Sequence, residues 1–263
     1  QLLTFDNVDG QKTFWHTASH VLAQAVKRLY PNAKCAIGPA VDNGFYYDFD
    51  VEKPFSPEDL EKIKAEMKKI VKSGLELERV ELSPEEAEKK LEEMNEPYKV
   101  ELVKEHSDKG EHITFYKQGE FIDLCAGPHL MSVAPIKAIE LTACTGAYWR
   151  GDANNAQLCR VYGVAFPKAS MLEEHLKKLE EAKLRDHNKL GRELEYFTTV
   201  DYVGQGLPIL LPKGARVVQL LQRWVEDVEQ SKGCLLTKTP LLAKRDLYKI
   251  SGHWDHYLDG MFV

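Results

Sequence analysis

The chain has 263 residues, of which 43% are hydrophobic and 29% charged, a composition typical of a globular protein that buries a core. Its formal net charge of −6 argues against a nucleic-acid binder with a generally basic surface, although a whole-chain balance can hide a local basic face. Five scattered cysteines without a CxxC pair indicate reduced thiols and a cytoplasmic location, and no apolar run approaches the roughly 18 residues of a membrane span.

Helices and strands alternate irregularly in the first part of the chain, which predicts an α+β fold. Apolar residues at helical spacing predict the first helix, and Ser-Pro-Glu segments that combine an N-cap, a proline and acids open the next two. These three helices are predicted over 14–29, 56–74 and 83–97. The segment CAIGPAVDNGFYYDFDVE predicts a hairpin around its Asn43-Gly44 turn. Further strands are predicted over 75–82, 98–104, 112–117, 120–124, 136–149 and 157–165.

From residue 168 to about 196 the sequence is highly charged with a thin apolar stripe, which predicts one long connecting helix. An amphipathic helix is predicted over 217–228, and LLTKTPLL (235–242) is predicted as a strand. We place a domain boundary inside the charged helix. Because the sequence begins on Gln1 without signal-peptide features and ends inside an apolar run, we expect it to be part of a longer protein.

Two pairs of potential ligands stand out. His16 and His20 are four residues apart on the first predicted helix, so they share one face. Thr17 occupies the position of the catalytic glutamate of an HExxH metalloprotease, which excludes that class. The second pair, Cys125 and His129, lies in FIDLCAGPHL, where the chain leaves a predicted strand.

Three imidazoles and a thiol suit two kinds of site. They match the ligand set of a tetrahedral zinc site, and the same groups without a metal can hold and activate a water molecule by hydrogen bonds. Composition does not separate these two cases. Phosphate-binding loops, dinucleotide-binding loops and GxSxG nucleophile elbows are absent from the sequence.

Five segments together resemble bacterial-type threonyl-tRNA synthetases, and they occur in that family's order over essentially the whole chain. They are WHTASHVLAQAVKRLYP, IGPAVDNGFYYDF, FIDLCAGPHL, GAYWRGDANNAQLCRVYG and GHWDHYLDGMF. The combination of HxxxH and CxxxH is also similar to the editing domains of alanyl-tRNA synthetases. The AYWRGD segment and the C-terminal part favour the threonyl family.

The resemblance implies a division into three parts. Residues 1–165 would form an editing domain, built from a sheet and helices, that hydrolyses seryl-tRNA formed in error on tRNA(Thr). Residues 166–195 would form a linker helix. Residues 196–263 would form the beginning of the class II aminoacylation domain, an antiparallel-sheet domain, with Pro240 near a dimer interface. The rest of the catalytic domain and the anticodon-binding domain would lie outside this chain.

The resemblance also assigns roles to individual residues. His16 and Lys99 match the water-handling residues of the family, while His20, Cys125 and His129 match the other catalytic motif positions. Two further residues are expected to contact the substrate. Asp123 would bind the amino group or the hydroxyl of the substrate, and Tyr47 would line the pocket. From the sequence alone, Lys99 would be a solvated strand residue and Tyr47 a packing residue.

The expected partner is the acceptor end of tRNA(Thr) carrying serine, and the full-length enzyme is expected to be a homodimer. Editing is expected to need no cofactor, whereas zinc, ATP and Mg²⁺ would serve the missing catalytic part that attaches threonine to its tRNA. If zinc does bind in this chain, its ligands would be His16, His20, Cys125 and His129. Two alternatives remain open: an alanyl-type zinc-dependent editing hydrolase, and a non-catalytic tRNA-binding module.

Overall fold

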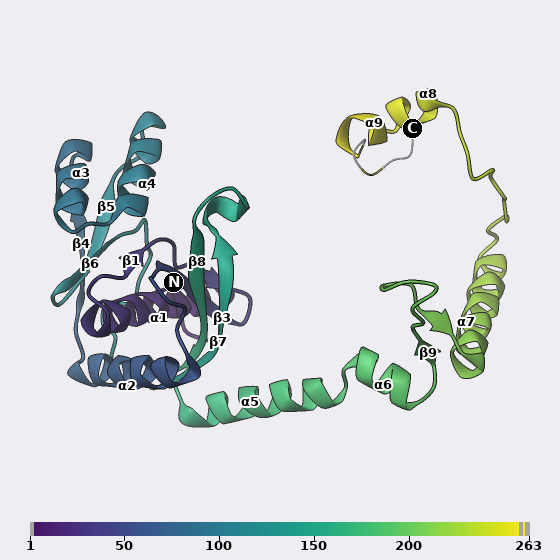
Figure 1. Cartoon of the computed structure of the whole chain (residues 1–263), viewed down its shortest axis with the longest axis horizontal. Helices are drawn as coiled ribbons and strands as arrows, with labels where there is room; N and C mark the ends of the chain where they lie inside the picture. Colours follow the sequence, from purple (N-terminus) through teal and green to yellow (C-terminus); the bar gives the residue numbers. More distant parts are fainter. Residues whose placement is uncertain (1–2, 258–259, 261–263) are drawn as a thin grey trace. The chain divides into compact units, whose positions relative to one another are not determined.

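The computed structural model describes residues 3–257 and residue 260. The chain divides into two compact units, one that extends to Glu181 and one that begins at Ala182 (Figure 1). Every strand pair among the described residues is antiparallel. This mixture of helices and antiparallel sheets confirms the predicted α+β class.

The first unit is built around helix α1 (Val8–Leu29), which is almost wholly buried along its middle. It begins six residues earlier than the pattern predicted, because Val8-Asp9-Gly10 forms the first turn of the helix instead of a separate turn. A Cβ atom at Gly10 would collide with the carbonyl oxygen of Thr4, so the segment before the helix packs closely across this turn. Burial on several sides leaves α1 well suited to hold side chains in fixed positions.

The main sheet has the strand order β1-β3-β8-β7, and β2 also pairs with β3. The predicted hairpin is confirmed as β2 and β3, and the two predicted late strands are confirmed as the long pair β7 and β8. The strands are β1 (Lys34–Cys35), β2 (Ala40–Val41), β3 (Gly44–Asp50), β7 (Ala138–Tyr148) and β8 (Gln157–Phe166), and the short 3-10 helix η1 (Trp149–Gly151) lies between the last two. One hydrophobic core joins this sheet to α1 and to α2 (Pro57–Ser73).

A smaller sheet of order β4-β5-β6 lies beside α3 and α4 (Figure 1). Its strands are β4 (Leu77–Glu81), β5 (Thr114–Gln118) and β6 (Phe121–Leu124), as predicted within a few residues. Helix α3 (Pro84–Glu93) starts at a capping box between Ser83 and Glu86, also as predicted.

The predicted strand 98–104 is wrong, because this segment belongs to helix α4 (Pro97–Asp108). Pro97 occupies the first helical turn, where its missing N–H costs nothing. Val100 and Val103 then pack with Leu91 of α3 and Phe115 of β5 in a second hydrophobic cluster. The apolar residues that indicated a strand therefore serve two sides of a helix, because Leu102 packs in a separate cluster with Trp149.

The charged segment predicted as one helix is broken in two. Helix α5 (Ala169–Leu184) ends before Asp186, whose side chain accepts a hydrogen bond from the Lys189 N–H and so caps helix α6 (His187–Glu193). The short strands β9 (Phe197–Thr198) and β10 (Ile209–Leu210) follow and pair with each other.

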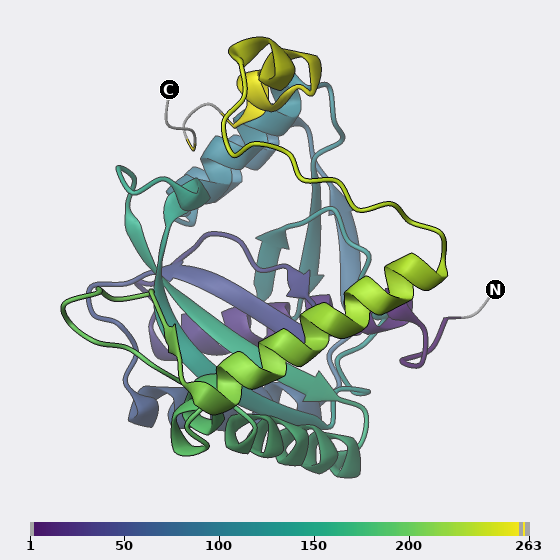
Figure 2. The same ribbon diagram turned by 90° about the vertical axis from the view of Figure 1, so that its right-hand side faces the viewer.

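The second unit continues with the predicted amphipathic helix, α7 (Pro212–Ser231), which is unbroken (Figure 2). Two short helices, α8 (Arg245–Ile250) and α9 (His253–His256), come later. The strand predicted over 235–242 is wrong, because no strand in the described part of the chain pairs with this exposed segment. Among the described helices, none combines the length and the apolar character needed to cross a bilayer.

Candidate functional site

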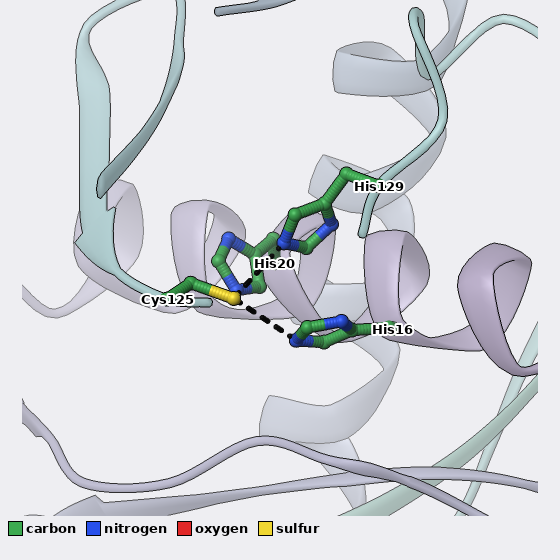
Figure 3. Close-up of side chains that lie close together, drawn as sticks. All are labelled: His16, His20, Cys125 and His129. Atoms are coloured by element: carbon green, nitrogen blue, oxygen red, sulfur yellow. Dashed lines mark hydrogen bonds between the residues drawn. The ribbon is translucent and has the colours of Figure 1, made fainter. Parts of the chain in front are cut away.

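The two ligand pairs, which are more than 100 residues apart in sequence, meet in the first unit (Figure 3). His16 and His20 lie one turn apart on α1, and Cys125 and His129 lie on the loop that follows β6. The Cys125 Sγ atom is 3.2 Å from His16 Nε2 and 3.2 Å from His129 Nε2. One potential ligand atom from each of the four residues lies within 4.8 Å of all the others.

The hydrogen bonds of the imidazoles define their tautomers. His16 Nδ1 lies 3.2 Å from the Pro128 carbonyl oxygen, which can only accept, so this nitrogen carries the proton. The Thr17 hydroxyl donates to the Thr13 carbonyl oxygen at 2.9 Å. Its oxygen must therefore accept from His129 Nδ1, 3.2 Å away. Both Nε2 atoms consequently direct a lone pair at the single sulfur of Cys125.

The surroundings of this cluster favour neutral groups. Burial lowers the pKa values of His16, His20 and His129 and raises the pKa of the Cys125 thiol to about 12. A neutral thiol has one proton to donate, and two Nε2 lone pairs face it. One of the two nitrogens is therefore left free to accept a hydrogen bond from water.

The same four side chains have the ligand types and the spacing that zinc requires. Tetrahedral zinc with bonds of about 2.0–2.1 Å to nitrogen and about 2.3 Å to sulfur places such ligands roughly 3.5 Å apart. The two nitrogen–sulfur distances of 3.2 Å are close to this separation. His20 Nδ1 is buried without a hydrogen-bond partner among the described residues. His16, His20, Cys125 and His129 are thus the residues that would hold a zinc ion, which would polarise a carbonyl oxygen or a bound water.

Asp123 lies directly beside this cluster, at the end of β6. Its carboxylate accepts from Tyr47 Oη at 2.5 Å, pairs with Lys99 Nζ at 2.8 Å and lies 3.7 Å from His20 Nε2. Asp123, Lys99 and Tyr47 are all buried. Burial alone lowers the pKa of Lys99, but the Asp123 carboxylate outweighs this effect and raises it, so the ammonium group stays charged.

All seven residues named from the sequence thus lie in one connected group, but Lys99 lies in an unexpected setting. It was expected on an exposed strand and is instead a buried residue of helix α4. Its ammonium group donates to Asp123 and to the Leu124 carbonyl oxygen at 3.5 Å. A lysine ammonium has three N–H donors, so one remains for a further partner.

The loop after β6 is shaped by residues that the sequence did not single out. Thr114 of β5 holds Cys125 through two hydrogen bonds. The Cys125 N–H donates to the Thr114 carbonyl oxygen, and the Thr114 hydroxyl donates to the Cys125 carbonyl oxygen. Gly127 has φ +76°, and a Cβ atom there would collide with the ring hydroxyl of Tyr116. Its N–H lies 3.3 Å from Cys125 Sγ and donates to it. These contacts fix the direction of the thiol.

A surface cavity of about 420 Å³ opens beside His16. Its walls come from the first turns of α1, from the segment before β3 and from the Gly127-Pro128 loop, and they consist of Asp9, Lys12, Thr13, His16, Pro39, Ala40, Gly127 and Pro128. Lys12 is exposed. The cavity gives a ligand a route from solvent to the His16 side of the cluster.

Comparison with known proteins shows which proteins this chain is similar to. Residues 113–162 match the family described as the threonyl and alanyl tRNA synthetase second additional domain. The chain is 64% identical over 263 residues to threonine–tRNA ligase of Clostridium perfringens strain 13, and 60% identical over 262 residues to that of Clostridium botulinum strain Alaska E43. The enzyme of Caldanaerobacter subterraneus subsp. tengcongensis is 53% identical over 262 residues. The resemblance to threonyl-tRNA synthetase is confirmed.

The match to threonyl-tRNA synthetases covers the whole chain but only 40% of the length of these three relatives. The chain is therefore similar to one part of a threonyl-tRNA synthetase. The second additional domain, as matched, contains Asp123, Cys125 and His129, while His16, Tyr47 and Lys99 come from residues before it. The site is thus completed by elements outside the matched family segment.

Proposed function

We propose that this chain carries the post-transfer editing site of a threonyl-tRNA synthetase, which hydrolyses seryl-tRNA(Thr). The observation that carries the proposal is the meeting of two Nε2 lone pairs at the Cys125 thiol, directly beside the buried Asp123–Lys99 pair. The family similarity supplies the substrate class, because the relatives are named as threonine–tRNA ligases.

A threonine-specific enzyme has a chemical need for such a site. Serine lacks one methyl group of threonine, and a methylene-sized difference gives only about 1–3 kcal/mol of discrimination in a binding pocket. An aminoacylation pocket that accepts threonine therefore also accepts serine, and some tRNA(Thr) is charged with serine in error. A second pocket that hydrolyses the serine ester and excludes the additional methyl group removes the error.

In the proposed reaction, a water molecule adds to the ester carbonyl carbon of the seryl group. The free Nε2 lone pair of His16, at the solvent side of the cluster, accepts the proton of this water. The bond between the carbonyl carbon and the ribose oxygen then breaks, and a proton passes to that oxygen. The products are serine and tRNA with a free terminal hydroxyl.

The remaining residues hold the substrate and the water. The third N–H donor of Lys99 serves the water or the developing oxyanion, in a buried setting where charge stabilisation is strong. Asp123 retains acceptor capacity beyond Lys99 and Tyr47, and we assign this to the substrate ammonium or hydroxyl. His20, His129 and Cys125 keep the neutral hydrogen-bonded cluster in place, and Tyr47 forms a wall next to Asp123.

We further propose the assignment of the three parts: 1–165 as the editing domain, 166–195 as the linker and 196–263 as the start of the class II domain. The acceptor end of tRNA(Thr) is the partner, and the full-length enzyme is a cytoplasmic homodimer that attaches threonine with ATP. Editing in this proposal needs no metal, while ATP, Mg²⁺ and zinc serve the aminoacylation reaction.

A zinc-dependent, alanyl-type hydrolase is the second candidate. The specific observation in its favour is the donor set itself, in which three imidazoles and one thiol place their ligand atoms within 4.8 Å of one another. The match to a family shared by threonyl and alanyl enzymes agrees with either candidate.

The test is deacylation by the purified chain of serine esterified to tRNA(Thr) and to tRNA(Ala), before and after metal removal, together with elemental analysis for zinc. Rapid release of serine from tRNA(Thr) by a protein without bound zinc supports the proposal. Stoichiometric zinc, with activity that disappears on its removal and returns on its addition, supports the second candidate. A folded protein that binds tRNA and hydrolyses neither substrate is a non-catalytic module.

A further inference from the structure

Glu96 is a buried carboxylate outside the group of seven site residues. It is 3% exposed and is the N-cap residue of α4. Its side chain makes no capping hydrogen bond to the first turn of its own helix. A carboxylate at this position can accept hydrogen bonds from the free N–H groups of the helix, so its use elsewhere indicates another role.

The carboxylate instead joins two other elements. Its Oε1 atom accepts from Lys27 Nζ of α1 at 2.8 Å, and its Oε2 atom accepts from the Cys35 N–H of β1 at 2.6 Å. Helix α1 also carries His16 and His20, and β1 pairs with β3, the strand of Tyr47. One side chain therefore links α4 to α1, which carries two of the site residues, and to β1, the neighbour of the strand that carries a third.

Glu96 is also connected to Lys99 through the backbone. The Lys99 N–H donates to the Glu96 carbonyl oxygen at 3.1 Å, within the first turn of α4. From this turn the Lys99 side chain reaches the Asp123 carboxylate at 2.8 Å. Any shift of the first turn of α4 moves the Lys99 ammonium group relative to Asp123.

Tyr98 and Val100 pack this turn against two hydrophobic clusters, but its Glu96 side faces an open space. A cavity of about 180 Å³ lies between α1, β6 and the start of α4, and both Glu96 and Asp123 line it. A void of this kind leaves the helix end free to move into it when a directional contact is lost. A second polar anchor, the hydrogen bond of 3.0 Å from Tyr98 Oη to Asp50, lies at the less buried rim.

We infer that Glu96 is a positioning residue of the editing reaction, which sets the place of the Lys99 ammonium group by fastening the first turn of α4 to Lys27 and Cys35. This inference rests on the proposed function for its effect on the reaction rate. Its structural half, the dependence of Lys99 on Glu96, is independent of that function.

Glu96→Gln is the direct test, since the amide keeps the shape of the side chain and an acceptor oxygen but removes the charge. We expect kcat for seryl-tRNA(Thr) hydrolysis to fall about tenfold with KM nearly unchanged, because small misplacements of a catalytic group slow the chemical step. The matched control is Glu120→Gln, which removes a carboxylate that contacts α1 through Gln24 and Arg28 but does not contact α4. We expect the control to keep the wild-type kcat.

Two further measurements separate positioning from a general loss of structure. In a Lys99→Met background, Glu96→Gln should cause no additional loss of kcat, since the group that it positions is gone. With isotope-labelled lysine, the NMR signal of the Lys99 ammonium should shift in Glu96→Gln, and its protons should exchange with water at least tenfold faster. The Lys99→Met variant assigns this signal.

The outcomes are distinct. An unchanged Lys99 signal in Glu96→Gln overturns the inference, whether or not the chain hydrolyses seryl-tRNA. Equal kcat values for Glu96→Gln, Glu120→Gln and the wild type also overturn it. Absence of hydrolysis by the wild-type chain defeats the proposed function, and the NMR measurement then decides the link between Glu96 and Lys99 by itself.

Discussion

Thr17, between the two histidines of α1, controls the proton arrangement of the site. Its hydroxyl donates to Thr13, and its oxygen accepts from His129 Nδ1 and from the Leu130 N–H at 2.9 Å. Because the hydroxyl proton is committed to Thr13, His129 must keep its own proton on Nδ1. This side chain therefore directs the Nε2 lone pair of His129 at Cys125.

We predict that Thr17→Val slows seryl-tRNA hydrolysis about tenfold and destabilises the chain by about 1–3 kcal/mol, the cost of an unsatisfied buried donor. Thr17→Ser keeps the hydroxyl and should retain most of both properties. Rates from single-turnover deacylation and free energies of unfolding in urea measure the two effects. A valine variant with the rate and stability of the wild type would show that the hydrogen bonds of Thr17 do not matter, and the account of its role would then be wrong.

Only some residues of the candidate site could be predicted from the sequence. The spacing of His16 and His20, and of Cys125 and His129, is a local pattern, and it correctly identified four side chains that lie together. Lys99 was identified only through the family resemblance, because a single lysine among apolar residues has no local signature. Thr17 and Glu96 act through contacts with distant residues, which a single sequence does not display.

At the scale of elements, the predictions succeeded where local chemistry determines the structure. The N-cap serines Ser56 and Ser83 and the Asn43-Gly44 turn are local signals, and all three were confirmed. Helix α4 was missed because its apolar pattern suits a strand as well as a helix. Its packing against α3 and β5, which decides the outcome, involves residues distant in sequence.

The contact between α1 and the start of β6 gives a prediction about pH. Arg28 donates to the Glu120 carboxylate and lowers its pKa to about 2. A carboxyl whose pKa is lower in the folded state stabilises the fold above its unfolded pKa of about 4.3, and this contribution is lost as the pH falls towards 2. Because the Glu120 side chain is 58% exposed, solvent screens the pair.

We therefore predict that Glu120→Gln lowers the free energy of unfolding at pH 7 by only about 0.5 kcal/mol. The difference between variant and wild type should shrink below pH 4 and vanish only below about pH 2, once the carboxyl is protonated in both states. Urea denaturation at a series of pH values measures it. A difference that is constant across this range would show that the hydrogen bonds of Glu120, and not its charge, account for the effect.

At the scale of the whole molecule, the candidate site belongs to one unit. All seven site residues precede Glu181, the last residue of the first unit. The core of this unit is closed by α1, α2 and the main sheet without residues of the second unit. By contrast, α7 of the second unit exposes a series of large apolar side chains, including Leu221 and Trp224.

We predict that a chain shortened to residues 1–181 folds cooperatively and hydrolyses seryl-tRNA(Thr) with a kcat within about threefold of the longer chain, since it keeps the whole catalytic group. It should also be more soluble, because the exposed apolar face of α7 is removed. Circular dichroism during thermal unfolding and steady-state deacylation measure these properties. A folded but inactive short chain would show that residues after 181 contribute to the site.

The most direct test of the central claim compares two substrates that differ by one methyl group. In single-turnover hydrolysis, the 263-residue chain should remove serine from tRNA(Thr) about 100-fold faster than it removes threonine. This ratio is within the range expected for a difference of one methyl group. His16→Ala should abolish the serine reaction in a folded protein. Equal rates for the two esters, or a serine rate that survives in His16→Ala, would contradict the account of this site as a serine-selective hydrolytic centre.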